Sequence, residues 1–231
     1  MALWSAVGAL ATIGATSAVA RGLMLWGVPG VHLQANILAE HFGITALEIA
    51  SYEAKFVDHP VLTATHIGAG LIYLLLAPLQ FSSRIRLRHL QIHRRSGRLL
   101  VAVGILFGLS GLVLGLFRAY GGPAETSATT TFGVVFLGAL GTAVSRIRNG
   151  DVIGHRAWMI RAFGAAFGIA VVRVVLPVYM TLTHTAVRPA FGPSLWIGWL
   201  LSACAAELWL RYAPSSVSIG RGHVSAPRIP F

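Results

Sequence analysis

The chain contains one short sequence motif twice, and each copy ends in a histidine–arginine pair. In the first copy, six residues separate Arg84-Ile85-Arg86 from His93-Arg94. In the second copy, six residues separate Arg146-Ile147-Arg148 from His155-Arg156. Two imidazoles on facing helices can coordinate the two faces of one porphyrin, which gives a low-spin iron that carries electrons. The repeated phrase therefore predicts His93 and His155 as the axial ligands of a b-type haem.

Arginines beside these histidines could hold the propionates of such a group, because a guanidinium pairs with a carboxylate through two hydrogen bonds. The arginines that we expect in this role are Arg94, Arg98, Arg156 and Arg161. Each ligand also needs an acceptor for its second ring nitrogen, which the sequence does not identify. His89 is an alternative ligand, although its aligned residue in the second copy is Asp151. The competing interpretation is a basic turn that binds lipid head groups and sets the topology.

His66 and Arg173 form a second candidate site. Both lie inside long apolar stretches, where an ionisable residue is a functional hypothesis by default. A rise of 1.5 Å per residue places both in the outer half of a core about 30 Å thick. We favour a quinone, propionate or small-substrate site here over a second haem, because the facing span lacks a histidine and His184 lies at a span end. The alternative is a polar pair that only locks the bundle.

Other residue types narrow the chemistry further. Cys204 is the one cysteine, which excludes an internal disulfide and covalent haem attachment. No phosphate-binding loop, nucleophile elbow or zinc-protease motif is present, and acids are few, which disfavours hydrolysis and nucleotide chemistry. Gln80 and Trp158 fall near the cytoplasmic interface, where tryptophan is usually a belt residue. The histidines of the outer connector have irregular spacing that argues against a metal site, and they are His32, His41 and His59.

The composition determines the class of protein that must position these residues. Hydrophobic residues make up 55 % of the chain and charged residues 11 %, with a mean hydropathy of +0.73. Soluble domains carry about 25 % charged residues, so the chain is a polytopic membrane protein. The net charge of +11 comes from arginines at the ends of apolar stretches. That placement favours the positive-inside rule and anionic lipids as partners, and it argues against nucleic acid.

We predict an all-α fold with six transmembrane helices, four of which form a core from two duplicated hairpins. The core covers 60–185, and its spans run over about 60–82, 97–117, 131–146 and 157–183, with a Gly/Pro/Thr loop over 119–130. An N-terminal helix covers 1–29, an amphipathic connector 30–59, a C-terminal helix 193–212 and a tail 213–231. Glycines at four-residue spacing, as in Gly164-x-x-x-Gly168, indicate close helix packing.

The arginine distribution also predicts the orientation. The turns 83–98 and 146–156 and the tail are basic, whereas the connector 30–59 holds most of the acidic residues. The positive-inside rule then places both termini and both basic turns in the cytoplasm of a bacterium and the connector outside its inner membrane. Ala18-Val19-Ala20 is similar to a signal-peptidase site, but no basic segment precedes it, so we expect an uncleaved first helix.

Five clusters, in this order, resemble a family of bacterial predicted integral membrane proteins of unknown function. The clusters are His66-Ile67-x-Ala69-Gly70, Leu79-Gln80-Phe81, His93-Arg94-x-x-Gly97-Arg98, His155-Arg156-x-Trp158-Met159-Ile160-Arg161, and Arg173 with Leu176-Pro177. The resemblance covers about 60–185 and implies no activity. The core is also similar in fold to transmembrane cytochromes b and ferric-reductase-like bundles, from which it departs by lacking a histidine in span 131–146.

Taken together, these patterns predict a membrane protein that binds one b-type haem near the cytoplasmic face and takes part in electron transfer. Such a protein is an electron carrier rather than a stand-alone enzyme. A cofactor-free accessory subunit of a larger membrane complex is the first alternative. A small transporter or sensor that uses a cavity at His66 and Arg173 is the second.

Overall fold

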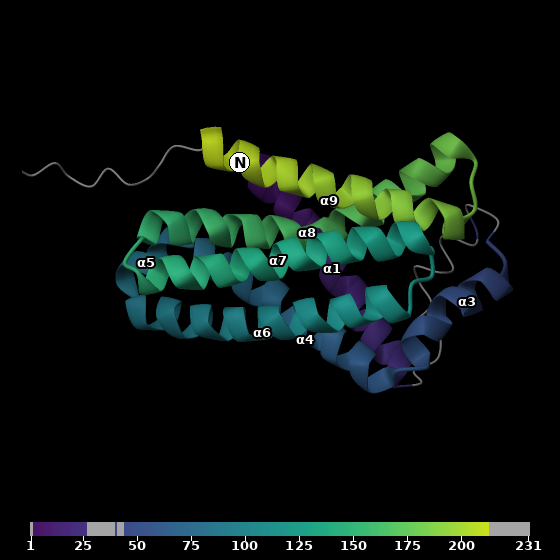
Figure 1. The fold of residues 1–231 in the computed structure, drawn as a ribbon, viewed down its shortest axis with the longest axis horizontal. Helices are drawn as coiled ribbons and strands as arrows, with labels where there is room; N and C mark the ends of the chain where they lie inside the picture. The colour runs from purple at the N-terminus through teal and green to yellow at the C-terminus, as the bar shows by residue number, and fades with distance from the viewer. Residues whose placement is uncertain (1, 27–39, 41–43, 213–231) are drawn as a thin grey trace, which may run out of the picture.

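The chain forms a bundle of long helices that lie side by side (Figure 1). The computed structural model describes residues 2–26, 40 and 44–212, and this part is helical throughout apart from short turns. The helices are α1 (Ala2–Leu25), α3 (Ala46–Val57), α4 (Pro60–Phe81), α5 (Ser83–Arg88), α6 (Leu90–Phe117), α7 (Pro123–Arg148), α8 (Val152–Thr183) and α9 (Val187–Tyr212). All except α3 and α5 are long and apolar enough to cross a membrane, so the predicted six-span all-α fold is confirmed. The predicted tail and most of 30–43 fall outside the described residues.

The order of packing around the bundle follows the chain. Helix α4 packs on α6, α6 on α7, α7 on α8, and α8 on α9, while α1 lies against α4 and α8. The pairs α6/α8 and α4/α8 are both absent from the close contacts, whereas α7 packs on both α6 and α8, and α1 packs on both α4 and α8. The diagonal placement of α6 and α8 in a cyclic four-helix core therefore stays a prediction. The space between α4, α6, α7 and α8 is filled by a buried cluster of Tyr73, Ala77, Leu100, Phe136, Ala139, Leu140, Ala162 and Ala165.

Small residues allow α8 and α9 to approach closely. A Cβ atom on Gly168 would lie inside the ring of Trp199, and one on Gly164 would lie 2.8 Å from the Cβ of Ala206. The hydroxyl of Ser202 donates to the Gly164 carbonyl at 2.7 Å across the same interface. The glycine spacing in α8 therefore serves tight helix packing, as the sequence indicated.

Several helices are longer than the apolar stretches predicted. Helix α7 begins at Pro123 rather than near 131, because Gly122 adopts a φ of 70° and Pro123 favours the first turn. The Glu125 carboxylate then accepts the Gly121 N–H at 2.6 Å. Helices α6 and α8 begin at Leu90 and Val152, so they include about two turns ahead of the predicted spans, in which His93 and His155 lie beside arginines.

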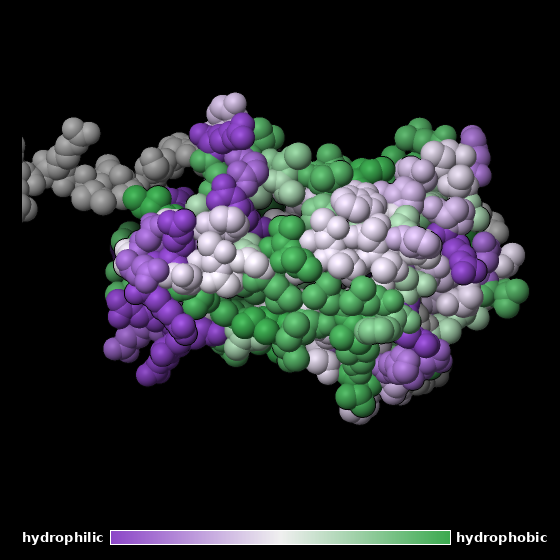
Figure 2. Space-filling view, viewed as in Figure 1, coloured by the Kyte–Doolittle hydropathy of each residue, from purple (hydrophilic) through white to green (hydrophobic). Residues whose placement is uncertain are grey.

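The two ends of the bundle differ in chemistry. Polar side chains gather at the end that carries α5, and apolar side chains cover much of the middle (Figure 2). We call the first of these the basic end, defined by Arg84, Arg86, Arg88, Arg94, Arg95, Arg98, Arg146 and Arg148. The opposite end carries α3, which begins with a capping box between Thr45 and Glu48. We call it the α3 end.

Candidate functional site

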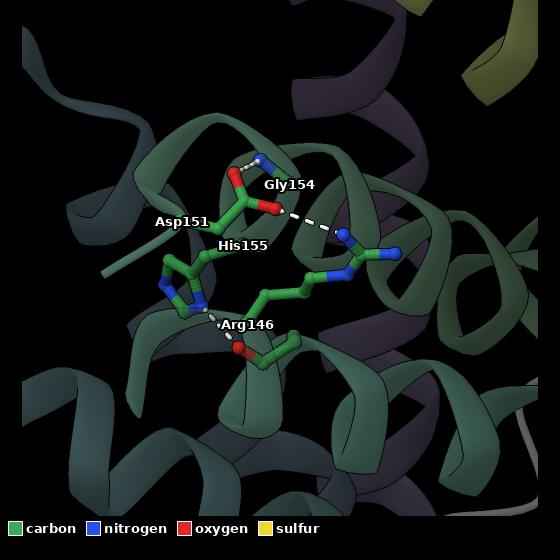
Figure 3. A network of polar contacts seen from close by, with 5 residues as sticks. Arg146, Asp151, Gly154 and His155 are labelled. Atoms are coloured by element: carbon green, nitrogen blue, oxygen red, sulfur yellow. Dashed lines mark hydrogen bonds and ion pairs between the residues drawn. The ribbon is translucent and has the colours of Figure 1, made fainter. Parts of the chain in front are cut away.

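His155 is held at the basic end by a backbone carbonyl of the neighbouring helix (Figure 3). Its Nδ1 lies 2.8 Å from the carbonyl oxygen of Ala143 in α7. Because a carbonyl only accepts, Nδ1 carries a proton, and in the neutral imidazole Nε2 is then the nitrogen with the lone pair. This is the tautomer of a histidine that ligates a metal through Nε2. The carbonyl supplies the acceptor that the sequence could not identify.

Asp151 positions the start of α8 and therefore positions His155. One carboxylate oxygen accepts the Gly154 N–H at 2.7 Å, and the other accepts from Arg146 at 3.1 Å (Figure 3). The Gly154 N–H, with a further contribution from Arg146, holds the pKa of Asp151 below its ordinary value. The carboxylate is therefore charged at neutral pH and stabilises the positive end of the helix dipole.

His93 has the same helical position as His155. Each is the fourth residue of its helix, and its N–H donates to the carbonyl of the N-cap residue, His89 for His93 and Asp151 for His155. His155, Arg86 and Arg94 are all near enough to act electrostatically on the His93 ring. The structure therefore brings the two predicted ligands into one neighbourhood.

The surroundings of the two rings differ. His93 is half-buried, and its Nδ1 is buried with no hydrogen-bond partner among the described residues. The Nδ1 of His155, by contrast, is anchored on Ala143. His89 is exposed and makes no side-chain cap bond at the start of α6.

The predicted arginines divide into two groups. Arg94 and Arg98 are exposed at the basic end, and Arg156 is half-buried. Arg161 instead pairs with Glu207 of α9, with Nε and Nη2 at 2.6 and 3.1 Å from the two carboxylate oxygens. Its guanidinium also lies 4.9 Å from the ring centroid of Trp158. Binding of a propionate by Arg161 would require this ion pair to break.

Glu207 is a site residue that the sequence analysis missed. Glu207 is an acidic residue inside an apolar span. Such a residue by itself indicates a polar partner within the helical bundle, so the sequence did contain a signal for this site. Gln80 contributes a second contact between helices, since its Nε2 donates to the Ser96 hydroxyl at 2.7 Å. A Cβ on Gly97 would lie 3.0 Å from the Gln80 oxygen, so Gly97 allows α4 and α6 to approach here.

His66 and Arg173 line one cavity of about 260 Å³ at the other end of the bundle. We call it the α3-end cavity and define it by five of its polar lining residues, which are Arg21, Tyr52, His66, Glu125 and Arg173. The predicted pair is therefore brought together by α4 and α8. Arg21 was missed as part of this site, because a single arginine at the end of an apolar helix is usually an interface residue.

Aromatic contacts hold the polar groups of the α3-end cavity. The His66 ring stacks on Phe107 at 4.8 Å, and its Nδ1 lies 3.2 Å from the Phe107 carbonyl and from the Ser110 hydroxyl. The Arg21 guanidinium lies 4.2 Å from the ring centroid of Phe56 and 5.1 Å from that of Tyr52. Helix α3 therefore fixes Arg21 through cation–π contacts.

The remaining histidines form no site in the described part of the chain. His184 ends α8 in a left-handed conformation and is exposed, and His59 is exposed at the N-cap of α4. His32, His41 and His223 lie outside the described residues. Within 2–26, 40 and 44–212, no three metal-ligating side chains come together.

Comparison with known proteins identifies the family. Residues 63–210 match the family described as predicted membrane protein (DUF2306). The chain belongs to this family. No curated protein and no solved structure matches.

The DUF2306 match extends the resemblance found in the sequence to α9. It includes His66, His93, His155 and Arg173, and it also includes Glu207, the partner of Arg161. Arg21, α1 and α3 precede the matched residues. The family description supports a membrane protein of unknown function and assigns none of these residues a role.

Proposed function

We propose that the chain binds one b-type haem at the basic end, with His93 and His155 as axial ligands, and takes part in membrane electron transfer. The observation that carries this proposal is the matched position of the two histidines. Each is the fourth residue of its helix, and both helices pack on α7. When bound between two imidazoles, haem supplies a one-electron couple rather than an open coordination site.

The protonation of His155 supports the proposal. Its Nδ1–H is fixed on the Ala143 carbonyl, so Nε2 is the nitrogen available to ligate iron. Two ligands suit haem, whereas a structural zinc site requires four and a catalytic one three. The described residues contain no cluster of three such ligands.

His93 would ligate through Nε2 without a protein acceptor on its buried Nδ1. Its bond to iron is therefore the less constrained of the two. Arg94 and Arg156 are the propionate partners that we propose, because Arg161 already has Glu207. The task of these residues is to hold, orient and bury the group.

We also propose that the basic end faces the cytoplasm of a bacterial cell from its inner membrane. Arginines are concentrated there, and anionic lipid head groups of the inner leaflet would neutralise them. With six spans, both termini lie on that side.

The test is a reduced-minus-oxidised visible spectrum of protein made with ample haem and purified in detergent. Wild type should show Soret and α bands with about one haem per chain, and His93→Ala and His155→Ala should each lose them. The matched control is His89→Ala, which removes an exposed neighbouring imidazole and should keep the spectrum. A flat wild-type spectrum would overturn the proposal and favour a cofactor-free accessory subunit. An unchanged spectrum in folded His155→Ala would overturn the ligand assignment.

A further inference from the structure

Two buried residues that line the α3-end cavity carry hydroxyl groups with no hydrogen-bond partner in the described part of the chain. They are Ser17 of α1 and Tyr73 of α4, which are 5 % and 3 % exposed. A serine inside a helix commonly donates to a carbonyl one turn back, as Ser110 does to Leu106, but Ser17 does not. Buried hydroxyls are nearly always paired, because an unpaired one has given up its bonds to water. The two hydroxyls therefore indicate a ligand in this cavity.

Ser17 and Tyr73 lie at similar levels of the bundle. The register between their helices follows from Gly14, because a Cβ there would lie 3.5 Å from the Leu74 side chain of α4 and 3.7 Å from Ala170 of α8. Ser17 follows Gly14 by three residues in α1, and Tyr73 precedes Leu74 by one residue in α4. A helix rises 1.5 Å per residue, so both residues lie within one turn of this contact. One ligand between α1 and α4 can therefore reach both hydroxyls.

The charged side chains of the cavity already make contacts within the protein. The Arg21 guanidinium lies 4.2 Å from the ring centroid of Phe56, and the Glu125 carboxylate accepts a backbone N–H at 2.6 Å. Arg173 also interacts within the protein. The hydroxyls of Ser17 and Tyr73 are neutral donors, and they suit an uncharged ligand whose oxygens accept hydrogen bonds.

Aromatic rings form much of the wall of the cavity. The Phe107 ring lies between two nearly parallel rings, with centroids 4.8 Å from His66 and 6.2 Å from Tyr73 and an interplanar angle of 21° in each case. Phe163 and Phe167 of α8 form another stacked pair in the lining. Stacked rings of this kind favour a flat ligand. The volume of about 260 Å³ lies just below the range of roughly 300–1,000 Å³ found for small-molecule sites, so it suits a head group with a single ring.

We propose that the α3-end cavity binds the head group of a quinone, with the Tyr73 hydroxyl donating to one ring carbonyl and the Ser17 hydroxyl to the other. A quinone is flat and uncharged, and it carries two acceptors on opposite edges of one ring. Water is the competing occupant, but a buried water usually makes about three hydrogen bonds, and the lining here is mostly apolar. This inference does not depend on the proposed haem, which lies at the opposite end of the bundle.

The experiment measures binding of radiolabelled decylubiquinone to the full-length protein in detergent, and wild type should bind it saturably. Tyr73→Phe and Ser17→Ala each remove one hydroxyl with little change in shape. Each should raise the Kd about 3- to 10-fold, because one neutral hydrogen bond is lost. The matched controls are Tyr179→Phe and Ser194→Ala, since these described residues lie outside the cavity lining. Both controls should leave the Kd unchanged.

The stability of the ligand-free protein separates a ligand-binding hydroxyl from a structural one. Removing a buried hydroxyl that has no partner in the protein relieves a cost, so ligand-free Tyr73→Phe should resist unfolding by SDS at least as well as wild type. The same measurement shows that the variant is folded. A less stable Tyr73→Phe with an unchanged Kd would overturn the proposal, because the hydroxyl would then serve the fold.

A last arm uses only wild-type protein, so that a folding defect in a variant cannot decide the result. Decylbenzene, which has a ring and the same chain without the carbonyl oxygens, should compete at least about tenfold more weakly than unlabelled decylubiquinone. Equal competition by decylbenzene would overturn the proposal, because the hydroxyls would then not matter. Stronger competition by palmitate or by dodecanal would overturn the quinone assignment in favour of a charged head group or a single carbonyl. An unchanged Kd in folded Tyr73→Phe would overturn the proposed role of its hydroxyl.

Discussion

Replacing Gly168 with alanine tests the contact that joins α8 to α9. An added Cβ would overlap Cδ1 of Trp199 and lie 2.7 Å from its Cγ and Nε1. The indole ring must therefore retreat until these distances approach 3.4 Å, where ordinary van der Waals contact begins. Phe132 limits that retreat, because its ring stacks on Trp199 with centroids 5.2 Å apart. The strain therefore reaches α7 as well.

The expected change in stability of Gly168→Ala is the difference between two free-energy contributions of opposite sign. Overpacking of this kind costs about 1–3 kcal/mol, whereas exchanging glycine for alanine within a helix gains about 0.5–1 kcal/mol. We expect Gly168→Ala to lower the free energy of unfolding by about 1–2 kcal/mol. Gly138→Ala and Gly141→Ala are matched controls on α7, since no heavy atom lies within 4 Å of the added Cβ at either position. Neither control should be destabilised.

The assay is unfolding by SDS in mixed micelles, followed by circular dichroism and by tryptophan fluorescence. Trp199→Leu removes the ring that the new methyl group meets, so Gly168→Ala should lose less stability in that background. If Gly168→Ala is as stable as wild type, or if Trp199→Leu brings no rescue, the described packing of α8 on α9 is wrong.

Two further predictions concern ion pairs that fix the site. A double-mutant cycle of Arg161→Gln and Glu207→Gln should give a coupling energy of about 0.5–1 kcal/mol, because the ion pair is bidentate but partly exposed. If the losses of stability in the two single variants simply add, the ion pair contributes nothing to stability. Since the pKa of Asp151 lies below 3.8 in the folded chain, its stabilisation is complete above that pH and is lost as the pH falls through the lowered pKa. Asp151→Asn should therefore show a smaller fall in Tm on acidification than wild type, and an equal fall would assign the acid sensitivity to other groups.

Much of the site could be predicted because ionisable residues inside apolar stretches are few. His66 and Arg173 were paired on depth alone, and the structure places both in the α3-end cavity. The matched places of His93 and His155 were likewise visible in the repeated phrase. Their cofactor remains a prediction, as does the cytoplasmic orientation.

The partners of these residues could not be predicted, for a common physical reason. Depth along a helix follows from counting residues, but the direction that a side chain faces depends on how neighbouring helices pack. Arg161 faces Glu207 of α9, and Arg21 faces the aromatic rings of α3. Helices α6, α7 and α8 also begin before the predicted spans, because caps and interfacial turns extend a helix beyond its apolar stretch.

The sequence by itself determined that the chain has six stretches long and apolar enough to cross a membrane and that arginines are concentrated in two of the turns between them, because length, hydropathy and charge are local properties of each segment. The tertiary structure alone decided which groups meet. It placed the Ala143 carbonyl beside Nδ1 of His155 and gathered Arg21 and Arg173 around one cavity. These contacts between helices depend on how each helix is rotated about its axis and on the close approach that glycines permit. The sequence of a single apolar stretch does not contain that information.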